Sequence, residues 1–195
     1  MRIEDYALIG DMQSAALVGR DGSIDWLCLP RFDSPSCFGA LLGDEDHGQW
    51  WLGPAEGGRR PSDRRRYRGD TLVLENEWDT SGGTVRVIDF MPPRQTNPDL
   101  VRIVEGVSGT VDMSTEIHIR FDYGRTVPWV RRTGDLLHAV GGPDSVWLHS
   151  PCRCTASGSR TRAPSGSRRA SAWRSPSPGT RPTRIAPSRS TPSSS

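Results

Sequence analysis

The sequence contains no lysine, so all 25 of its basic side chains are arginines. It also has no apolar run long enough to cross a membrane. Its first residues, MRIEDYALIGDMQ, carry acids where a secretory signal has a basic start followed by an apolar stretch. These absences predict a cytoplasmic protein that has no membrane partner.

Cysteine is also scarce, and the four positions are Cys28, Cys37, Cys152 and Cys154. Disulfide frameworks belong to exported proteins, so we expect Cys28 and Cys37 to be buried thiols. Cys152 and Cys154 lack the two-residue spacer and the second cysteine pair typical of zinc sites. We therefore assign them no metal.

Glycine-rich phosphate loops are missing as well. Gly82–Gly83 and Gly141–Gly142 lie between predicted strands rather than in front of helices, which argues against a nucleotide-using enzyme. The cluster Asp44–His47 offers oxygen ligands, but its spacing matches no established calcium loop, and we interpret it as a solvated turn. The other histidines are isolated, and we expect them at the surface or as caps: His118, His138 and His149. The sequence predicts no cofactor and no metal.

Charge is distributed unevenly along the chain. Residues 1–150 hold 16 arginines and all 23 acidic residues, a net charge of −7, whereas residues 152–195 hold nine arginines and no acid, a net charge of +9. The second segment consists almost entirely of Ser, Arg, Pro, Ala, Thr and Gly. It has too little apolar surface to offset the entropy of ordering, so residues 151–195 are predicted to form a disordered tail.

This tail has two interpretations. It is either a functional basic arm that binds phosphate backbones nonspecifically, or the product of translation in a shifted reading frame. A gene rich in G and C yields mainly these residue types when it is read out of frame. The abrupt change after a strand-like stretch favours the shifted frame.

Residues 1–150 show short apolar stretches separated by turn residues. The expected strands are 6–10, 15–19, 24–29, 49–52, 65–78, 84–90, 100–107, 111–121, 135–140 and 144–149. Asp21–Gly22 between apolar runs is a hairpin signal, and Phe38–Leu42 is short enough for one or two helical turns. Turn signals about every ten residues, without a long amphipathic helix, predict an all-β domain built as an antiparallel β-sandwich.

Residues 3–43 resemble the opening of the bacterial trehalase-like and glucoamylase-like proteins of glycoside hydrolase family 15. The matching elements are Ile9–Asp11, Ala15–Val18, Asp21–Trp26 and Pro30–Pro35 with Phe38 following. The hairpins beyond residue 43, and Val87–Pro92 in particular, are also similar to this family. The resemblance covers residues 1–150.

The resemblance implies a β-sandwich of the super-sandwich type that precedes an (α/α)6 barrel. In the family, the barrel carries the two glutamates that hydrolyse the glycosidic bond. Inverting hydrolysis needs a carboxylic acid and a carboxylate about 6.5–9.5 Å apart across the sugar, and neither is assignable to a position of this sequence. We therefore expect no catalytic residue in this chain, a catalytic barrel as its partner, and an α-glucoside such as trehalose as the substrate of the parent enzyme.

Three residues near the matching motifs are candidates for the rim of a sugar site or for domain docking: Trp26, Arg31 and Asp33. Sugar sites combine aromatic faces with charged side chains on loops. The alternation of Ile24, Trp26 and Cys28 also fits one buried strand face, and Arg31 with Asp33 could simply pin the loop. We favour a structural or docking role over contact with sugar.

The leading hypothesis is an accessory β-domain that docks on a catalytic barrel and is inactive alone. A second hypothesis is a freestanding carbohydrate-binding β-sandwich. The third is a nucleic-acid binder that uses the basic tail and the run Arg64–Arg66 with Arg68, although the aromatic platform of such binders is not evident. We expect no nucleic-acid partner.

Overall fold

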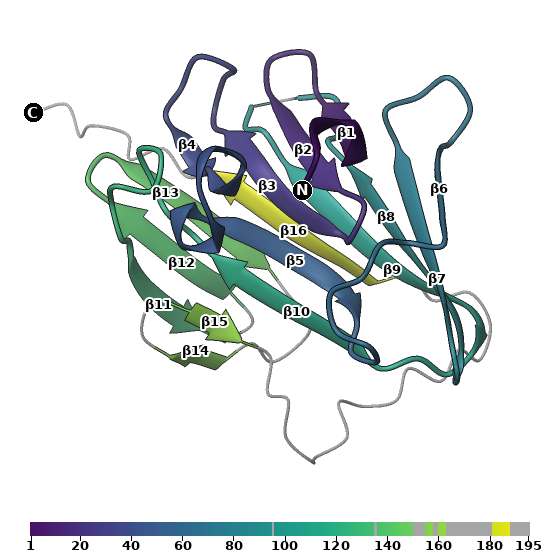
Figure 1. Ribbon diagram of the computed structural model, residues 1–195. Coiled ribbons are helices and arrows are strands. Elements are labelled where there is room, and N and C mark those ends of the chain that lie inside the picture. Colours follow the sequence, from purple (N-terminus) through teal and green to yellow (C-terminus); the bar gives the residue numbers. More distant parts are fainter. Residues whose placement is uncertain (95, 135, 150–154, 158–159, 163–180, 188–195) are drawn as a thin grey trace, which may run out of the picture.

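The computed structural model describes residues 1–94, 96–134, 136–149, 155–157, 160–162 and 181–187 (Figure 1). Within these ranges the chain forms sixteen strands and three short 3-10 turns, and no α-helix. The turns are η1 (Ile3–Asp5), η2 (Ala40–Leu42) and η3 (Glu45–His47). No helix in the described part of the chain is long and apolar enough to span a membrane.

Two eight-stranded antiparallel sheets build the domain. Sheet A runs in the order β1-β2-β3-β5-β10-β15-β14, and β4 also pairs with β3. Its strands are β1 (Tyr6–Gly10), β2 (Ala15–Gly19), β3 (Ser23–Cys28), β4 (Ser36–Phe38), β5 (Gln49–Pro54), β10 (Met113–His118), β14 (Thr155–Ser157) and β15 (Arg160–Arg162).

Sheet B runs in the order β11-β12-β13-β16-β9-β8-β7-β6. Its strands are β6 (Arg64–Tyr67), β7 (Leu74–Thr80), β8 (Gly83–Phe90), β9 (Leu100–Gly109), β11 (Trp129–Thr133), β12 (Leu136–Gly141), β13 (Asp144–His149) and β16 (Arg181–Pro187). Apolar side chains of both sheets share one core cluster, which contains Ile9, Val18 and Ile24 from sheet A and Leu74, Leu100 and Leu148 from sheet B. The prediction of an all-β antiparallel sandwich is confirmed.

The Asp21–Gly22 hairpin forms as predicted and joins β2 to β3. Gly22 has a φ of +85°, and a Cβ atom there would lie 2.3 Å from the carbonyl oxygen of Leu52. Only glycine fits this position, because both the left-handed backbone and the neighbouring strand exclude a side chain. The turn thereby brings the Gly22 carbonyl close to the centre of the sandwich.

A β-bulge in β3 changes the direction of Trp26. Val18 pairs with Ile24, but the adjacent Leu17 pairs with Trp26, so Asp25 is the extra residue. As a result Ile24 and Leu27 enter the core, and Trp26 is half-buried outside it. The expectation that Ile24, Trp26 and Cys28 share one face was wrong, because period-two alternation breaks at a bulge.

Arg102 of β9 links the two sheets from inside the sandwich. Its guanidinium is fully buried and pairs with Asp89 of β8 at 2.8 Å. The same group donates to the carbonyl oxygens of Trp50 (2.8 Å) and Gly22 (2.7 Å) in sheet A. Its Cζ also lies 5.0 Å from the centroid of the Trp50 ring. One side chain therefore holds both layers in register.

The loops at one end of the sandwich pack together. Gly39 lies against the backbone of His47 and of Tyr123, and Gly124 lies against His47. Gly141, at the end of β12, lies against Phe121. Figure 1 shows β4 and the β12–β13 hairpin at this same end. We call this the loop end, and it consists of residues 29–48, 119–128 and 141–144.

Several predicted elements differ from the observed ones. Phe38–Leu42 was expected to hold one or two helical turns, and the structure has a single 3-10 turn, η2, after β4 ends at Phe38. Strand β11 was not predicted, since Trp129–Thr133 has four polar or exposed positions and no clear alternation. Within the predicted tail the structure describes strands β14, β15 and β16, which pair through their backbones. For the other residues of 151–195, which lie outside the described part, disorder stays a prediction.

Candidate functional site

Trp26 meets a second aromatic ring at the loop end. The ring centroids of Trp26 and Tyr123 are 6.0 Å apart, with an angle of 37° between the planes. Trp26 is half-buried and Tyr123 is 41% exposed. Tyr123 comes from the turn between β10 and β11, so the fold brings together two residues that are far apart in the sequence.

The backbone that carries Tyr123 is left-handed at two consecutive non-glycine residues. Asp122 has a φ of +51° and Tyr123 a φ of +56°, and Gly124 follows with +93°. Hydrogen bonds between Phe121 and Thr126 close this turn in both directions at 3.0 Å. Such conformations cost roughly 1–3 kcal/mol per residue and cluster at functional sites.

The loop after β3 carries the other two predicted residues. Arg31 Nε donates to Asp33 Oδ1 at 2.9 Å, and the hydrogen bond and the cation together hold the pKa of Asp33 below its usual value. Both side chains are well exposed. The backbone amide of Arg31 donates to Ser34 Oγ at 3.1 Å. The pair pins its own loop, and a role beyond this stays a prediction.

Trp26 is preceded by a buried carboxyl group. Asp25 is only 7% exposed, and Tyr6 donates to its Oδ2 at 2.6 Å. Its Oδ1 is buried without a hydrogen-bond partner in the described part of the chain. Burial raises the pKa of Asp25, and the hydrogen bond from Tyr6 offsets this only in part. Asp25 is also the extra residue of the β-bulge in β3.

Next to Asp25, the outer face of sheet A is covered by a polar network. His118 is fully buried, with Nδ1 3.2 Å from the carbonyl oxygen of Glu45 and Nε2 3.2 Å from Glu116. Arg59 lies over the Trp51 ring and pairs with Glu116 at 3.2 Å. The prediction that His118 is a surface or capping residue was wrong, because η3 covers this face of the sheet.

The cluster Asp44–His47 forms a 3-10 turn with a capping box, in which Asp44 accepts from the Asp46 amide at 3.0 Å. This agrees with its interpretation as a turn. Among the residues that the structure describes, no group of three or more His, Cys, Asp or Glu side chains is placed to hold a metal ion.

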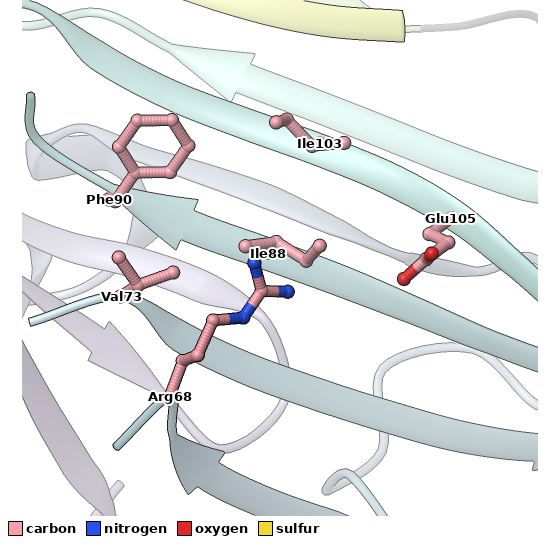
Figure 2. Close-up of a pocket in the computed structure, with 6 residues that line it drawn as sticks. All are labelled: Arg68, Val73, Ile88, Phe90, Ile103 and Glu105. Carbon is pink, nitrogen blue, oxygen red and sulfur yellow. The ribbon is translucent and has the colours of Figure 1, made fainter. Parts of the chain in front are cut away.

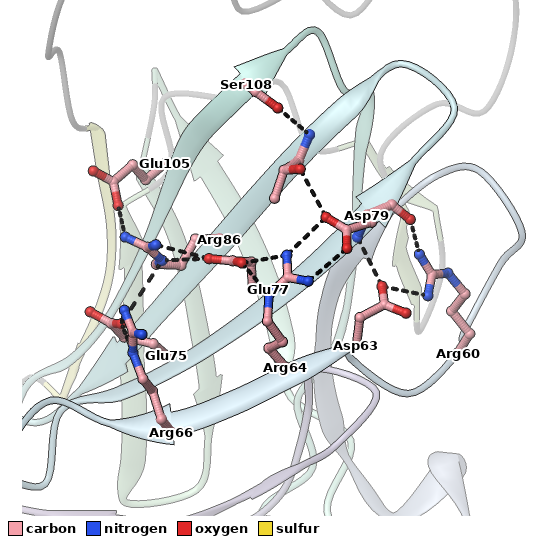
Figure 3. A network of polar contacts seen from close by, with 11 residues as sticks. Arg60, Asp63, Arg64, Arg66, Glu75, Glu77, Asp79, Arg86, Glu105 and Ser108 are labelled. Atoms are coloured by element: carbon pink, nitrogen blue, oxygen red, sulfur yellow. Dashed lines mark hydrogen bonds and ion pairs between the residues drawn. The ribbon is translucent and has the colours of Figure 1, made fainter.

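The predicted basic run lies on the edge of sheet B, where acids of β7 face it. Glu75 accepts from Arg66 at 2.9 Å and from Arg68 at 2.8 Å. Further along, Arg64 pairs with Asp79, and Arg86 joins Glu77 to Glu105, as Figure 3 shows. We call this set the arginine ladder: Arg64, Arg66, Arg68, Glu75, Glu77, Asp79, Arg86 and Glu105. Its cations are matched by carboxylates, so it is a poor surface for phosphate backbones.

Beside the arginine ladder, the outer face of sheet B has an open hollow of about 330 Å³. Figure 2 shows its lining residues, which are Arg68, Val73, Ile88, Phe90, Ile103 and Glu105. The one carboxylate among them, Glu105, is paired with Arg86 at 3.0 Å. Glycoside hydrolysis needs two carboxyl groups on opposite sides of the sugar. This hollow therefore lacks the chemistry of a hydrolytic site.

The loop end offers different chemistry, namely two partly exposed aromatic rings beside charged side chains. Of the three predicted residues, the structure brings Trp26 of β3 against Tyr123 of the loop end and places Arg31 and Asp33 on another loop of the same end. Sequence reasoning missed Tyr123. The available signal was the string Phe121–Gly124 (FDYG), because aspartate and glycine together favour a left-handed turn.

Residues 1–163 match the family model described as "Trehalase-like, N-terminal". The trehalases of Mycobacterium tuberculosis and Mycolicibacterium smegmatis are each 38% identical to the chain over 142 residues, which is 63% of this chain and 20% and 21% of theirs. "Trehalase 1" of Sulfolobus acidocaldarius is 35% identical over 136 residues, covering 68% of this chain and 22% of its own length.

The chain thus spans about a fifth of the length of the curated relatives that it matches. No solved structure gave a significant match. The match to the family model extends to residue 163, beyond the boundary at residue 150 that the sequence suggested.

Proposed function

Because the chain belongs to the family of trehalase-like N-terminal domains, we propose that it is the accessory β-domain of an α-glucoside hydrolase and contributes no catalytic carboxylate. The observation that carries this proposal is the family match over residues 1–163, combined with an alignment that reaches only about a fifth of each curated trehalase. Glu105, the one carboxylate that lines the hollow of sheet B, is paired with Arg86, and this further supports a domain without a catalytic carboxylate.

In this proposal the domain docks on the catalytic part through the outer face of sheet A. Leu8 pairs with Leu17, so these two apolar side chains lie side by side across β1 and β2. Leu8 is 44% exposed and Leu17 is half-buried. Neighbouring apolar side chains on an outer sheet face are typical of an interaction surface. The arginine ladder makes the outer face of sheet B less suited to this role.

The proposal places the protein in the cytoplasm. Cys28 and Cys37 are free and buried, and burial raises the pKa values of both thiols. Free thiols of this kind are usual in a reducing compartment. A nucleic-acid function is disfavoured in comparison, because the run of arginines on β6 is matched by carboxylates of β7.

The proposal is tested by replacing the aligned part of the M. smegmatis trehalase with residues 1–163 of this chain. We expect the chimera to hydrolyse trehalose within about tenfold of the parent rate. We expect the parent that lacks its aligned part to be much slower, because the docking contacts are gone. The purified 195-residue chain should release no glucose from trehalose.

Leu8→Asp in the chimera tests the docking face, with Leu72→Asp as a matched control, because Leu72 is exposed to nearly the same extent (45%) but lies before β7 of sheet B. The Leu8 variant should lose activity while the Leu72 variant keeps it. Hydrolysis of trehalose by the purified chain would refute the accessory role. Equal activity of the two variants would refute docking through this face.

A further inference from the structure

We propose that Trp26 and Tyr123 together form a stacking site for one pyranose ring of an α-glucoside. The choice of sugar rests on the proposed function, since the curated relatives are trehalases. The site itself is argued from the geometry of the loop end.

Two separate features of the backbone bring the rings together. The bulge at Asp25 turns Trp26 out of the core, where strict alternation would have buried it with Ile24. The left-handed turn at Asp122 and Tyr123 places the second ring 6.0 Å from the first. Bulges that redirect a side chain and strained non-glycine residues are both concentrated at functional sites. Their convergence on one pair of rings is the main argument for a binding role.

The exposure of the rings fits a ligand better than a structural contact. Tyr123 stays 41% exposed although its backbone is strained. If the pair served only packing, burial of the ring would be the expected gain from holding this conformation. An exposed aromatic face instead offers the C–H-rich side of a sugar ring an apolar surface to lie on.

Charged groups for the sugar hydroxyls come from the same turn. Asp122 and Arg125 approach each other only to 3.7 Å, beyond normal hydrogen-bond distance, and both side chains are largely exposed. A few polar or charged groups beside aromatic side chains are what fixes the orientation of a small ligand. The loop end therefore offers a sugar both an apolar platform and polar groups.

Trp129 provides a matched comparison within the chain. It is 73% exposed on the edge strand β11, and no second aromatic ring lies against it in the described ranges. If any exposed aromatic side chain bound sugar, Trp129 would do so at least as well as Tyr123. The proposal requires that it does not.

The experiment is a titration of the 195-residue chain with trehalose, followed by saturation-transfer NMR and by chemical shifts of the indole N–H groups. We expect a dissociation constant in the millimolar range, about 1–10 mM, because one small contact surface is used. Tyr123→Ala should weaken binding at least ~tenfold, which corresponds to ~1.4 kcal/mol. Tyr123→Phe should keep it, since the ring suffices for stacking, and Trp129→Ala should leave it unchanged.

Thermal unfolding of each variant separates binding from folding. A Tyr123→Ala chain that unfolds at the wild-type temperature and binds trehalose ~tenfold more weakly supports the site. Unchanged binding in that variant, or the same loss in Trp129→Ala, overturns it. If Tyr123→Ala is destabilised, Tyr123→Leu is the deciding variant, because leucine keeps the apolar bulk but has no aromatic face. The proposal requires that Tyr123→Leu also loses binding. Absence of binding in the wild-type chain overturns this site but leaves hydrolysis by the chimera, and hence the accessory role, untouched.

Discussion

Arginine–carboxylate pairs occur in two contrasting regions of this molecule. Between the sheets, Arg102 and Asp89 are fully buried, and the guanidinium also donates to the Trp50 and Gly22 carbonyl oxygens. On the outer face of sheet B, the arginine ladder spreads the same kinds of groups from β6 to β9, and most of its arginines are exposed to water. The chemistry is the same and the surroundings differ.

The contrast shows what arginine does in a chain without lysine. Inside, its planar fork reaches two carboxylate oxygens and two carbonyls at once, which a lysine ammonium on a flexible stem does less well. Outside, each pair is screened by water and salt, and its net contribution to stability is small. The buried pair should therefore determine whether the sandwich forms, and the arginine ladder should mainly keep one outer face neutral.

Arg102→Met should have the largest effect on stability. It leaves Asp89 buried without its cation and removes the guanidinium donor from the Trp50 and Gly22 carbonyl oxygens. We expect a loss of about 3–5 kcal/mol in the free energy of unfolding, measured by urea titration. For a domain of this size, that is a large part of the total stability.

The double variant Arg102→Met with Asp89→Leu is the control for this prediction. It removes both charges, so part of the lost stability should return. If the single variant loses no more stability than a typical surface substitution, within about 0.5 kcal/mol, the buried pair is not what joins the sheets.

Glu75→Gln should have an intermediate effect. Glu75 is the most buried carboxylate of the arginine ladder, at 4% exposed, and accepts from Arg66 and Arg68. Glutamine keeps the shape but weakens these charge-assisted bonds, so we expect a loss of about 1–3 kcal/mol in urea titration. Glu105, which pairs with Arg86, is far more exposed, so Glu105→Gln should lower the free energy of unfolding clearly less. Equal losses would contradict the role of burial.

Low pH should weaken the arginine ladder, because Glu75 becomes protonated. Burial by itself would raise the pKa of Glu75, but the hydrogen bonds from Arg68 and Arg66 outweigh it and leave the pKa below its usual value. A carboxyl with a lowered folded-state pKa contributes stability above its unfolded pKa of about 4.3, and this contribution is lost as pH falls through the folded value. Urea titrations from pH 7 to pH 3 should therefore show a steeper decline for the wild type than for Glu75→Gln. Parallel curves would show that Glu75 is not the group responsible.

The fold class was predictable because apolar alternation and turn residues mark most strands directly. Ile117, Ile119 and Phe121, for example, enter the core as their spacing predicts. The direction of Trp26 was not predictable, since one bulge residue reverses the alternation and nothing in SIDWLC marks it. The burial of His118 also escaped prediction, because it depends on η3, which lies far away in the sequence.

The candidate site was predictable only in part, for a similar reason. Trp26 stood out by its motif, whereas Tyr123 matters only because its left-handed turn meets Trp26 in space. Arg31 and Asp33 were noticed together, and the structure does join them in one ion pair. Residues that act through local spacing can be found in a sequence, and residues that act through tertiary contact cannot.

Arg64→Ala should have the smallest effect. Arg64 pairs with Glu77 at 2.5 Å and with Asp79 at 2.8 Å, so by contact distances alone it resembles Arg102. Its side chain is exposed, however, and water replaces the lost bonds when it is removed. In 150 mM salt, where charges are screened beyond about 8 Å, the urea midpoint should stay within experimental error of the wild type. A loss comparable to that of Arg102→Met would mean that distance rather than burial sets the strength of these pairs, and the contrast between the two regions would no longer hold.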